Sequence, residues 1–421
     1  MPPFRDPNTT KAQSAPTHFL LRFPQPFPNI APLMSKKPEN VHQETVAVRA
    51  GIDSDQQHGA VIPPLYLSSN FSFEGFGKPR PYDYTRSGNP TRDQLAEALA
   101  ELEGGAGGVV TATGMGAVHL VTQFVQPGET LVAANDCYGG CHRLFTNVSA
   151  RGLFDLEWLP LWHTERSVQR ILELKPKMVW VETPSNPLLR ITDIEPLAKA
   201  AHEVGALVVA DNTFLSPVGQ SPLALGADIV LHSTTKYING HSDVVGGAVV
   251  AKEPAMAEEL AWWANCLGLT GSPFDSFQTM RGLRTLNVRY RQHEENAAAV
   301  VDFLEKHPAV ERVYFPGLAS HPGHEVAARQ QKSFGAMISF ELKADESAVP
   351  AFLEQLRLFT LAESLGGVES LIAHPCTMTH AAMSAEDHHA AGLNARLLRL
   401  SIGIEHAGDL IADLERGFSA L

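Results

Sequence analysis

The residue with the clearest chemical role in this chain is Lys236, which stands just after an apolar, strand-like run. Hydroxyl side chains flank it at Ser233 and Thr235, and another apolar run upstream ends on Asp211. Pyridoxal 5′-phosphate needs an amine for its aldehyde, a carboxylate for its ring nitrogen and hydrogen-bond donors for its phosphate. These three kinds of side chain, in this order, predict a pyridoxal-phosphate site.

Each of these features also has an ordinary structural explanation. Most lysines are solvated surface groups, and an Asp-Asn pair after a strand commonly opens a turn. Here, however, the segment before Lys236 is apolar, and the segment after it is rich in glycine (Gly240, Gly246 and Gly247) and not in charge. This context favours a cofactor site, because motifs gain specificity from their surroundings.

Alternating helical and strand patterns explain how these side chains could meet. Strand patterns occupy 109–113, 130–134, 178–182 and 206–210, and helical patterns occupy 94–103, a helix that Gly114 opens, and 195–204. Such alternation predicts a mostly parallel sheet with functional groups at the carboxyl ends of its strands. Gly114, Asn186, Asp211 and Lys236 all fall at such ends, so we expect one crevice to gather them.

The two ends of the chain have a different character. Prolines crowd residues 1–40, which excludes regular helix and sheet there, and Met34 resembles an ordinary start. After about residue 295 a helical pattern at 296–306 leads to strands around 312–315 and 337–341. We therefore predict four parts, namely a disordered tail (1–40), an N-terminal arm (41–93), a large cofactor-binding domain (94–294) and a smaller C-terminal α/β domain (295–421).

Composition limits the classes of function. The 421 residues are 44% hydrophobic and 19% charged, which is ordinary for a soluble globular protein. The net charge of -13 argues against nucleic acid or an anionic membrane as a partner, and no apolar run approaches the length of a membrane span. Four cysteines without a second close pair indicate reduced thiols in the cytoplasm, and the 18 histidines lack metal-ligand spacing, so we expect no metal.

The segment 228–241, with Lys236 near its centre, resembles the signature of the Cys/Met-metabolism pyridoxal-phosphate enzymes. Segments 259–265, 281–286 and 361–371 extend this resemblance, which covers nearly everything after about residue 42. The family has the aspartate-aminotransferase-like fold, called fold type I. The resemblance therefore implies an α/β protein with a large domain around a mostly parallel sheet, an N-terminal arm and a smaller C-terminal α/β domain.

The resemblance also implies roles for individual residues. Lys236 would bond to the cofactor aldehyde and move protons during the reaction, and Asp211 would pair with the ring nitrogen. Tyr138 would stack on the ring and take part in catalysis, although without the family a turn aromatic beside Gly-Gly is a plausible reading. The other implied cofactor contacts are phosphate donors and one ring contact, namely Gly114, Met115, Ser233, Thr235 and Asn186.

The segment 82–91 carries a further implication. In the family it reaches across to a neighbouring subunit, where Tyr84 and Arg86 would bind that subunit's phosphate, since arginine offers phosphate a planar fork of donors. Gly-Asn-Pro-Thr within it is otherwise simply a turn and a helix start. The resemblance implies a homo-oligomer with shared active sites, either a dimer or a tetramer built as a dimer of dimers.

Arg399 lies inside an apolar strand pattern, where an arginine is costly unless it is paired. We expect it to hold the α-carboxylate of an amino-acid substrate through a bidentate pair. The resemblance adds Glu363 and Ser364 to the substrate pocket and places Asp83 and Arg143 near its distal end.

The activity that the resemblance implies is γ-replacement. O-succinylhomoserine, or another O-acylhomoserine, would react with L-cysteine to give cystathionine and the free acid, in methionine biosynthesis by transsulfuration. Cystathionine γ-lyase, O-acylhomoserine sulfhydrylase and methionine γ-lyase activities stay open, although Glu363 and Trp262-Trp263 favour replacement by resemblance. The acyl donor also stays open, because Ser87 stands where enteric relatives carry arginine. A non-catalytic cofactor carrier is disfavoured, since the chain retains Lys236 together with the other functional side chains.

Overall fold

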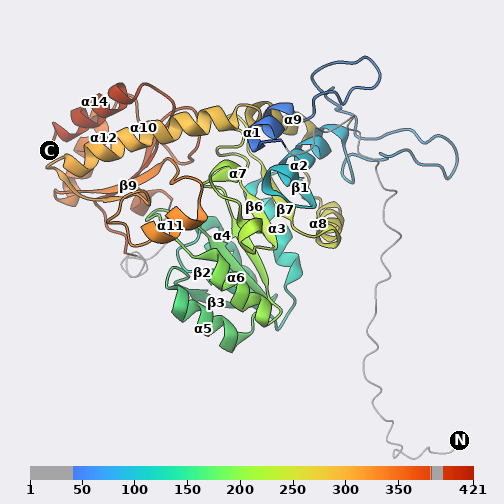
Figure 1. Ribbon diagram of the computed structural model, residues 1–421, viewed down its shortest axis with the longest axis horizontal. Coiled ribbons are helices and arrows are strands. Elements are labelled where there is room, and N and C mark those ends of the chain that lie inside the picture. Colours follow the sequence, from blue (N-terminus) through green and yellow to red (C-terminus); the bar gives the residue numbers. More distant parts are fainter. Residues whose placement is uncertain (1–40, 380, 382–391) are drawn as a thin grey trace, which may run out of the picture. The chain divides into compact units, whose positions relative to one another are not determined.

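The computed structural model describes residues 41–379, 381 and 392–421. The predicted tail, 1–40, lies outside the described residues. The part that is described contains two β-sheets with helices packed around them (Figure 1). None of its helices has both the length and the apolar character needed to cross a bilayer.

The larger sheet has seven strands in the order β1-β7-β6-β5-β4-β2-β3. Their bounds are β1 Gly107–Thr111, β2 Thr130–Ala134, β3 Asp155–Leu159, β4 Met178–Glu182, β5 Leu207–Asp211, β6 Ile229–His232 and β7 Gly247–Ala251. Strands β2 to β6 run parallel, whereas β7 is antiparallel to both β6 and β1. The prediction of a mostly parallel sheet is confirmed.

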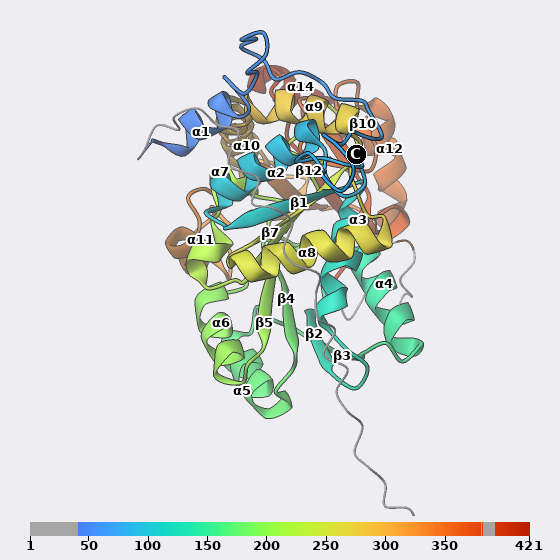
Figure 2. The same ribbon diagram turned by 90° about the vertical axis from the view of Figure 1, so that its right-hand side faces the viewer.

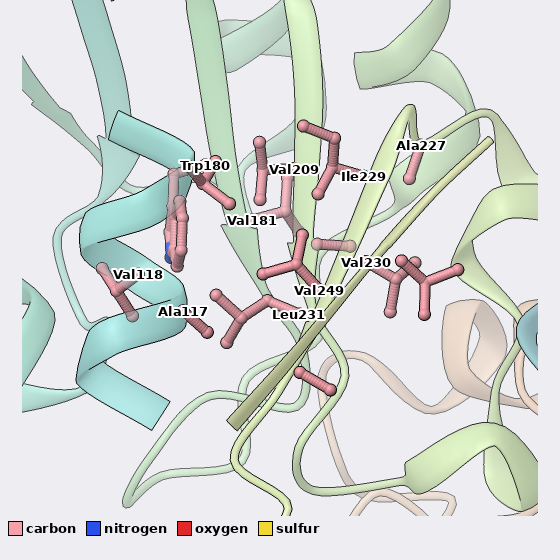
Figure 3. Packing of buried hydrophobic residues seen from close by; sticks show 14 of the residues in the cluster. Ala117, Val118, Trp180, Val181, Val209, Ala227, Ile229, Val230, Leu231 and Val249 are labelled. Carbon is pink, nitrogen blue, oxygen red and sulfur yellow. The ribbon is translucent and has the colours of Figure 1, made fainter. Parts of the chain in front are cut away.

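The central strands are apolar along their length because they are covered on both faces. Every residue of β4 is buried, and the side chain of Trp180 is fully enclosed. Helix α3 (Gly114–Val121) packs on β6 and β7, and Figure 3 shows its Ala117 beside Leu231. This packing fixes the amino-terminal end of α3 next to the carboxyl end of β6, where Lys236 follows.

Helix α2 (Pro90–Glu103) begins earlier than the predicted 94. The Asn89 side chain accepts hydrogen bonds from the N–H groups of Thr91 and Arg92, and proline suits the first helical position because its φ is already helical. The helix ends where Gly104 adopts a left-handed φ of 75°. The cap fixes the direction in which segment 82–88 leaves the body of the protein.

The remaining helices of this part cover or flank the large sheet, with α8 crossing beside β1 and β7 (Figure 2). They are α1 Gln43–Arg49, α4 Gly139–Ala150, α5 Thr164–Leu174, α6 Ile194–Glu203, α7 Ser216–Gly219, α8 Pro254–Leu267 and α9 Pro273–Leu283. Helices α4, α5 and α6 connect successive strands of the parallel part, as the alternating pattern predicted.

The smaller sheet has five strands in the order β10-β11-β12-β9-β8. Its strands are β8 Val310–Tyr314, β9 Met337–Leu342, β10 Thr360–Leu361, β11 Leu371–Ala373 and β12 Leu397–Ser401. The helices around it are α11 His324–Gln330, α12 Val349–Gln355 and α14 Ala407–Phe418. Strand β12 carries Arg399 and is buried at every position.

Helix α10 (Leu286–Lys306) has 21 residues and is ten residues longer than the predicted 296–306. Its first half is dense in charged side chains, which hide the helical spacing of the apolar ones. It buries Leu286 and Tyr290 in the core of the large sheet and Val300 and Leu304 in the core of the smaller one. The predicted domain boundary at 294/295 falls between these two groups, inside the helix (Figure 1).

Candidate active site

A cavity of about 400 Å³ lies where β4, β5 and β6 end and α3 begins. It brings together eleven of the predicted site residues, namely Gly114, Met115, Tyr138, Asn186, Asp211, Ser233, Thr235, Lys236, Glu363, Ser364 and Arg399. Three of these come from the segment 361–401 around the smaller sheet, and the others come from the ends of strands and helices of the larger one. The arrangement follows the rule that functional groups gather at the carboxyl edge of a parallel sheet.

Lys236 projects into this cavity from the segment after β6. Its Nζ donates a hydrogen bond of 2.7 Å to Ser364 Oγ. Burial, with the charge of Arg399 nearby, lowers the pKa of Lys236 to about 8. A useful fraction of the amine is therefore neutral near physiological pH, as a nucleophile and proton acceptor requires.

Ser364 has a strained backbone, with φ at 96° in a region that favours glycine. Its hydroxyl accepts from Lys236, and its carbonyl oxygen accepts a 2.8 Å hydrogen bond from Arg399 Nη2. The unusual backbone thus turns one residue towards both cationic groups. Strain of this kind is commonly retained at functional sites because the surrounding structure determines it.

Arg399 is almost fully buried, and its charge has no carboxylate partner at hydrogen-bonding distance among the described residues. Its Nη1 donates to Asn186 Oδ1 at 2.9 Å, and its Nε has no hydrogen-bond partner in the described part of the chain. Burial lowers the pKa of Arg399 to about 10. A buried guanidinium that is only partly satisfied by neutral groups is a ready site for a carboxylate.

Two carboxyl groups end neighbouring strands of the cavity. Asp211 on β5 is paired in register with Glu182 on β4. Asp211 Oδ1 accepts the N–H of Thr213 at 3.0 Å, and burial raises the pKa of Asp211. A cationic group placed against Asp211 would stabilise its ionised form.

The start of α3 forms a polar pocket at the other end of the cavity. The N–H groups of Gly114 and Met115 lie in the first helical turn, where N–H groups have no helical partners. A Cβ added to Gly114 would lie 3.0 Å from the Ser233 Cβ and 3.1 Å from its Oγ, so any larger residue would require Ser233 to shift. The Thr235 hydroxyl also lines the cavity and accepts a hydrogen bond from the Gly246 N–H at 3.0 Å.

Tyr138 borders the cavity at the start of α4, with its side chain about half exposed. Burial is the main cause that raises the pKa of Tyr138. Arg143, one turn further along α4, lines a second cavity of about 480 Å³ and not the first. The two cavities share Tyr138, Asn186 and Glu363, so the second one extends the first.

The predicted arm residues do not reach the cavity of their own chain. Arg86 Nη1 donates to the backbone and side-chain oxygens of Asn265, both at 2.9 Å. Tyr84 is 49% exposed, and Asp83 accepts from the Ser87 hydroxyl. Their separation from the cavity leaves the shared-site hypothesis as a prediction.

Three residues that line the cavity were not predicted from the sequence. Glu182, Thr113 and Thr213 all contribute to the cavity wall. Glu182 carried a usable signal, because it ends an apolar strand in the same way as Asp211 does. The two threonines carried none, since single threonines at strand ends are common in turns.

Comparison with known proteins identifies the relationship. The signature of the Cys/Met metabolism PLP-dependent enzymes matches residues 44–419. The chain belongs to this family. The cystathionine gamma-synthase of Escherichia coli strain K12 is 57% identical over 379 residues, covering 90% of this chain and 98% of that protein. The cystathionine beta-lyase of Coxiella burnetii is 46% identical over 375 residues, covering 89% and 97%.

A solved structure is also similar to this member of the family. The cystathionine gamma synthase of Xanthomonas oryzae pv. oryzae in complex with aminoacrylate and cysteine is 63% identical, with a TM-score of 0.89. The match covers 91% of this chain and 100% of that one. A second structure of that enzyme, in complex with cystathionine, matches equally well. The predicted fold and family are confirmed.

The cofactor of the family is pyridoxal phosphate, and the cavity fits it. A phosphate suits the pocket formed by the first turn of α3 and the Ser233 hydroxyl. A protonated ring nitrogen suits the buried Asp211 carboxylate, and an aldehyde suits the partly neutral amine of Lys236. No group of three or more His, Cys, Asp or Glu side chains in the described ranges is placed to hold a metal ion.

Proposed function

We propose that this chain catalyses γ-replacement, in which an O-acylhomoserine and L-cysteine give cystathionine and the free acid. The observation that carries the proposal is the convergence of Lys236 and Arg399 on Ser364, at 2.7 Å and 2.8 Å. It sets an amine for proton transfer beside a guanidinium for an α-carboxylate, as an amino-acid substrate requires. The names of the Escherichia coli and Xanthomonas oryzae relatives support this particular reaction.

Arg399 and Lys236 would have separate roles in this reaction. Arg399 would hold the α-carboxylate, which fixes the α-carbon near Lys236 Nζ. When bound, pyridoxal phosphate withdraws electrons from the substrate's carbon chain, so that protons can leave carbon and the γ-acyloxy group can depart. Lys236 would take those protons and return them, since a pKa of about 8 allows its amine to act in both directions.

We place the distal groups of the substrate in the second cavity. It begins at Glu363 and contains Arg143, whose guanidinium carries a positive charge suited to a distal carboxylate. Asp83 would join this end from a neighbouring subunit. We infer a succinyl, acetyl or phospho ester as donor, with the succinyl ester first because it alone of the three carries a distal carboxylate for Arg143.

A direct assay tests the reaction. Purified protein with cysteine and O-succinylhomoserine should release cystathionine and succinate in equal amounts, with O-acetylhomoserine as the comparison donor. Elimination is the second candidate, because a relative named cystathionine gamma-lyase, from Dictyostelium discoideum, is 44% identical. Release of 2-oxobutyrate at the same rate with and without cysteine would assign the chain to elimination instead.

We also propose a homo-oligomer with shared active sites, a tetramer built as a dimer of dimers, in the cytoplasm and in the transsulfuration route to methionine. The arm supports an oligomer, because it exposes large apolar side chains that a second copy would cover. These side chains are Val61, Leu67, Phe73, Phe76 and Tyr84. Four free cysteines support a reducing compartment.

Mixed oligomers test the shared site. Arg86→Ala subunits and Lys236→Ala subunits should each be inactive alone, and mixing them should restore part of the activity. Recovery is expected because one site of a mixed pair contains both intact groups. Subunit exchange should be verified with differently tagged chains, and mixed oligomers without any recovered activity would contradict shared sites.

A further inference from the structure

Glu182 is a buried glutamate at the edge of the cavity to which sequence reasoning gave no role. It ends β4, is 5% exposed and lines the cavity beside its register partner Asp211. A buried carboxyl group is costly unless hydrogen bonds or opposite charges satisfy it. The groups that satisfy Glu182 therefore indicate its role.

The partners of Glu182 are backbone donors of two other cavity residues. The N–H of Tyr138 donates to Glu182 Oε2 at 2.7 Å, and the N–H of Asn186 also donates to its carboxyl group. Tyr138 opens α4, and Asn186 follows β4 in the next loop. One carboxyl group thus ties together two segments whose side chains face the proposed position of the cofactor ring.

The charges around Glu182 oppose its ionisation. Asp211 on β5 and Asp136 in the loop before α4 are the charged groups acting on it, and both are anionic. The buried thiols of Cys137 and Cys141 also face it and supply no positive charge. Burial and the Asp211 carboxylate together raise the pKa of Glu182 well above its usual range.

Asp211 has a different environment on its other side. The hydrogen bonds that each carboxyl group accepts favour its ionised form, those from Tyr138 and Asn186 at Glu182 and those from Thr213 at Asp211. His232, which ends β6 next to β5, further favours the ionised form of Asp211. Of the two strand-end carboxyl groups, Asp211 is thus the one whose ionised form its neighbours stabilise more. Two carboxyl groups that share a buried site do not ionise equally, because like charges oppose each other.

We propose that Glu182 is a positioning residue that stays a neutral carboxylic acid, holds Tyr138 and Asn186 in place at the cofactor ring, and leaves the negative charge of the pair on Asp211. A protonated carboxyl group can do this because it keeps the capacity to accept hydrogen bonds. The proposal rests on the pyridoxal-phosphate cofactor of the family and is independent of the acyl donor, so substrate assays do not decide it.

Infrared difference spectroscopy of the protein without cofactor tests the protonation state. The spectrum of the wild type minus that of Glu182→Gln at pH 7 should contain the C=O stretch of one protonated carboxylic acid. Glu341→Gln is the matched control, because Glu341 is also buried but contacts Tyr314 and Arg396 and not the cavity. The band assigned to Glu182 should persist in that control.

Cofactor affinity tests the positioning. Glu182→Ala leaves the Tyr138 N–H without its acceptor, which should weaken binding of pyridoxal phosphate roughly 10- to 100-fold, the usual effect of an unsatisfied buried donor. Glu182→Gln keeps an acceptor without a charge, so its Kd should stay within about threefold of the wild type. Induced circular dichroism of the bound cofactor should follow the same order.

The glutamine variant decides the outcome even if the alanine variant does not fold. The neutral-acid role is wrong if the infrared difference spectrum lacks the C=O stretch of a protonated carboxylic acid. It is also wrong if the Kd of Glu182→Gln for the cofactor is tenfold or more above that of the wild type. Neither the infrared measurement nor the cofactor-binding measurement contains an amino-acid substrate. Their results therefore do not depend on which reaction the chain catalyses.

Discussion

Lys236→Ala should lower cystathionine formation by at least about 10³-fold, because it removes both the nucleophilic amine and the group that moves protons. The structure explains why no neighbour can substitute. Lys236 Nζ lies 2.7 Å from Ser364 Oγ, and the other cation of the cavity, Arg399, cannot lose a proton under ordinary conditions. Steady-state rates of the purified variant measure the effect.

Two further variants separate chemistry from structure. Lys236→Gln keeps a donor for Ser364 and should be as inactive as the alanine variant, whereas Lys306→Ala, at an exposed lysine paired with Asp302, should be fully active. Borohydride treatment of the wild type should attach the cofactor to the peptide that contains Lys236. Binding of pyridoxal phosphate to the cofactor-free wild type should be faster as pH rises through about 8, since the neutral amine reacts with the aldehyde. Activity retained in Lys236→Gln would overturn the proposed role.

Arg399→Ala should raise KM for the O-acylhomoserine by roughly 30-fold or more, because truncating one partner of a desolvated charge pair costs about 2–5 kcal/mol. The absorption of the bound cofactor should change little, since Lys236 and Asp211 are retained. Arg399→Lys should recover only part of the loss, because a lysine lacks the planar fork. Substrate-dependence curves for both variants measure the shift.

Arg289 provides a matched comparison. Arg289 is also a buried arginine, and burial lowers its pKa to about 10. Its guanidinium, however, donates hydrogen bonds to the backbone carbonyls of Tyr237, Ile238 and Gly282. Arg289→Ala should therefore lower the melting temperature and change KM little. A KM for Arg399→Ala equal to that of the wild type would mean that another group holds the carboxylate.

The parts of the site that follow strands were predictable from sequence. Lys236 and Asp211 each come after an apolar run, so strand periodicity alone places them at one edge of a sheet. Glu182 met the same condition, although a single acidic residue after a strand usually faces solvent. Its importance depends on Tyr138 and Asn186, and a sequence does not indicate which backbone N–H groups converge on a carboxyl group.

Other features depended on packing that periodicity does not reveal. The antiparallel strand β7 lies between β1 and β6, although β1 precedes it by more than a hundred residues. The strained backbone of Ser364 has no sequence signature, since glycine is the usual residue at such a φ. The roles of Tyr84 and Arg86 came from family resemblance alone, because a shared site cannot be read from one chain.

Helix α10 makes the two sheets dependent on each other in their stability. Leu286 and Tyr290 belong to one hydrophobic core, and Val300 and Leu304 belong to the other, on a single continuous helix. Unfolding of either core would remove the apolar contacts of half of this helix. Because helix formation is cooperative, the other half would be destabilised as well. The chain is therefore built to unfold as one cooperative unit, although its two sheets resemble separate domains.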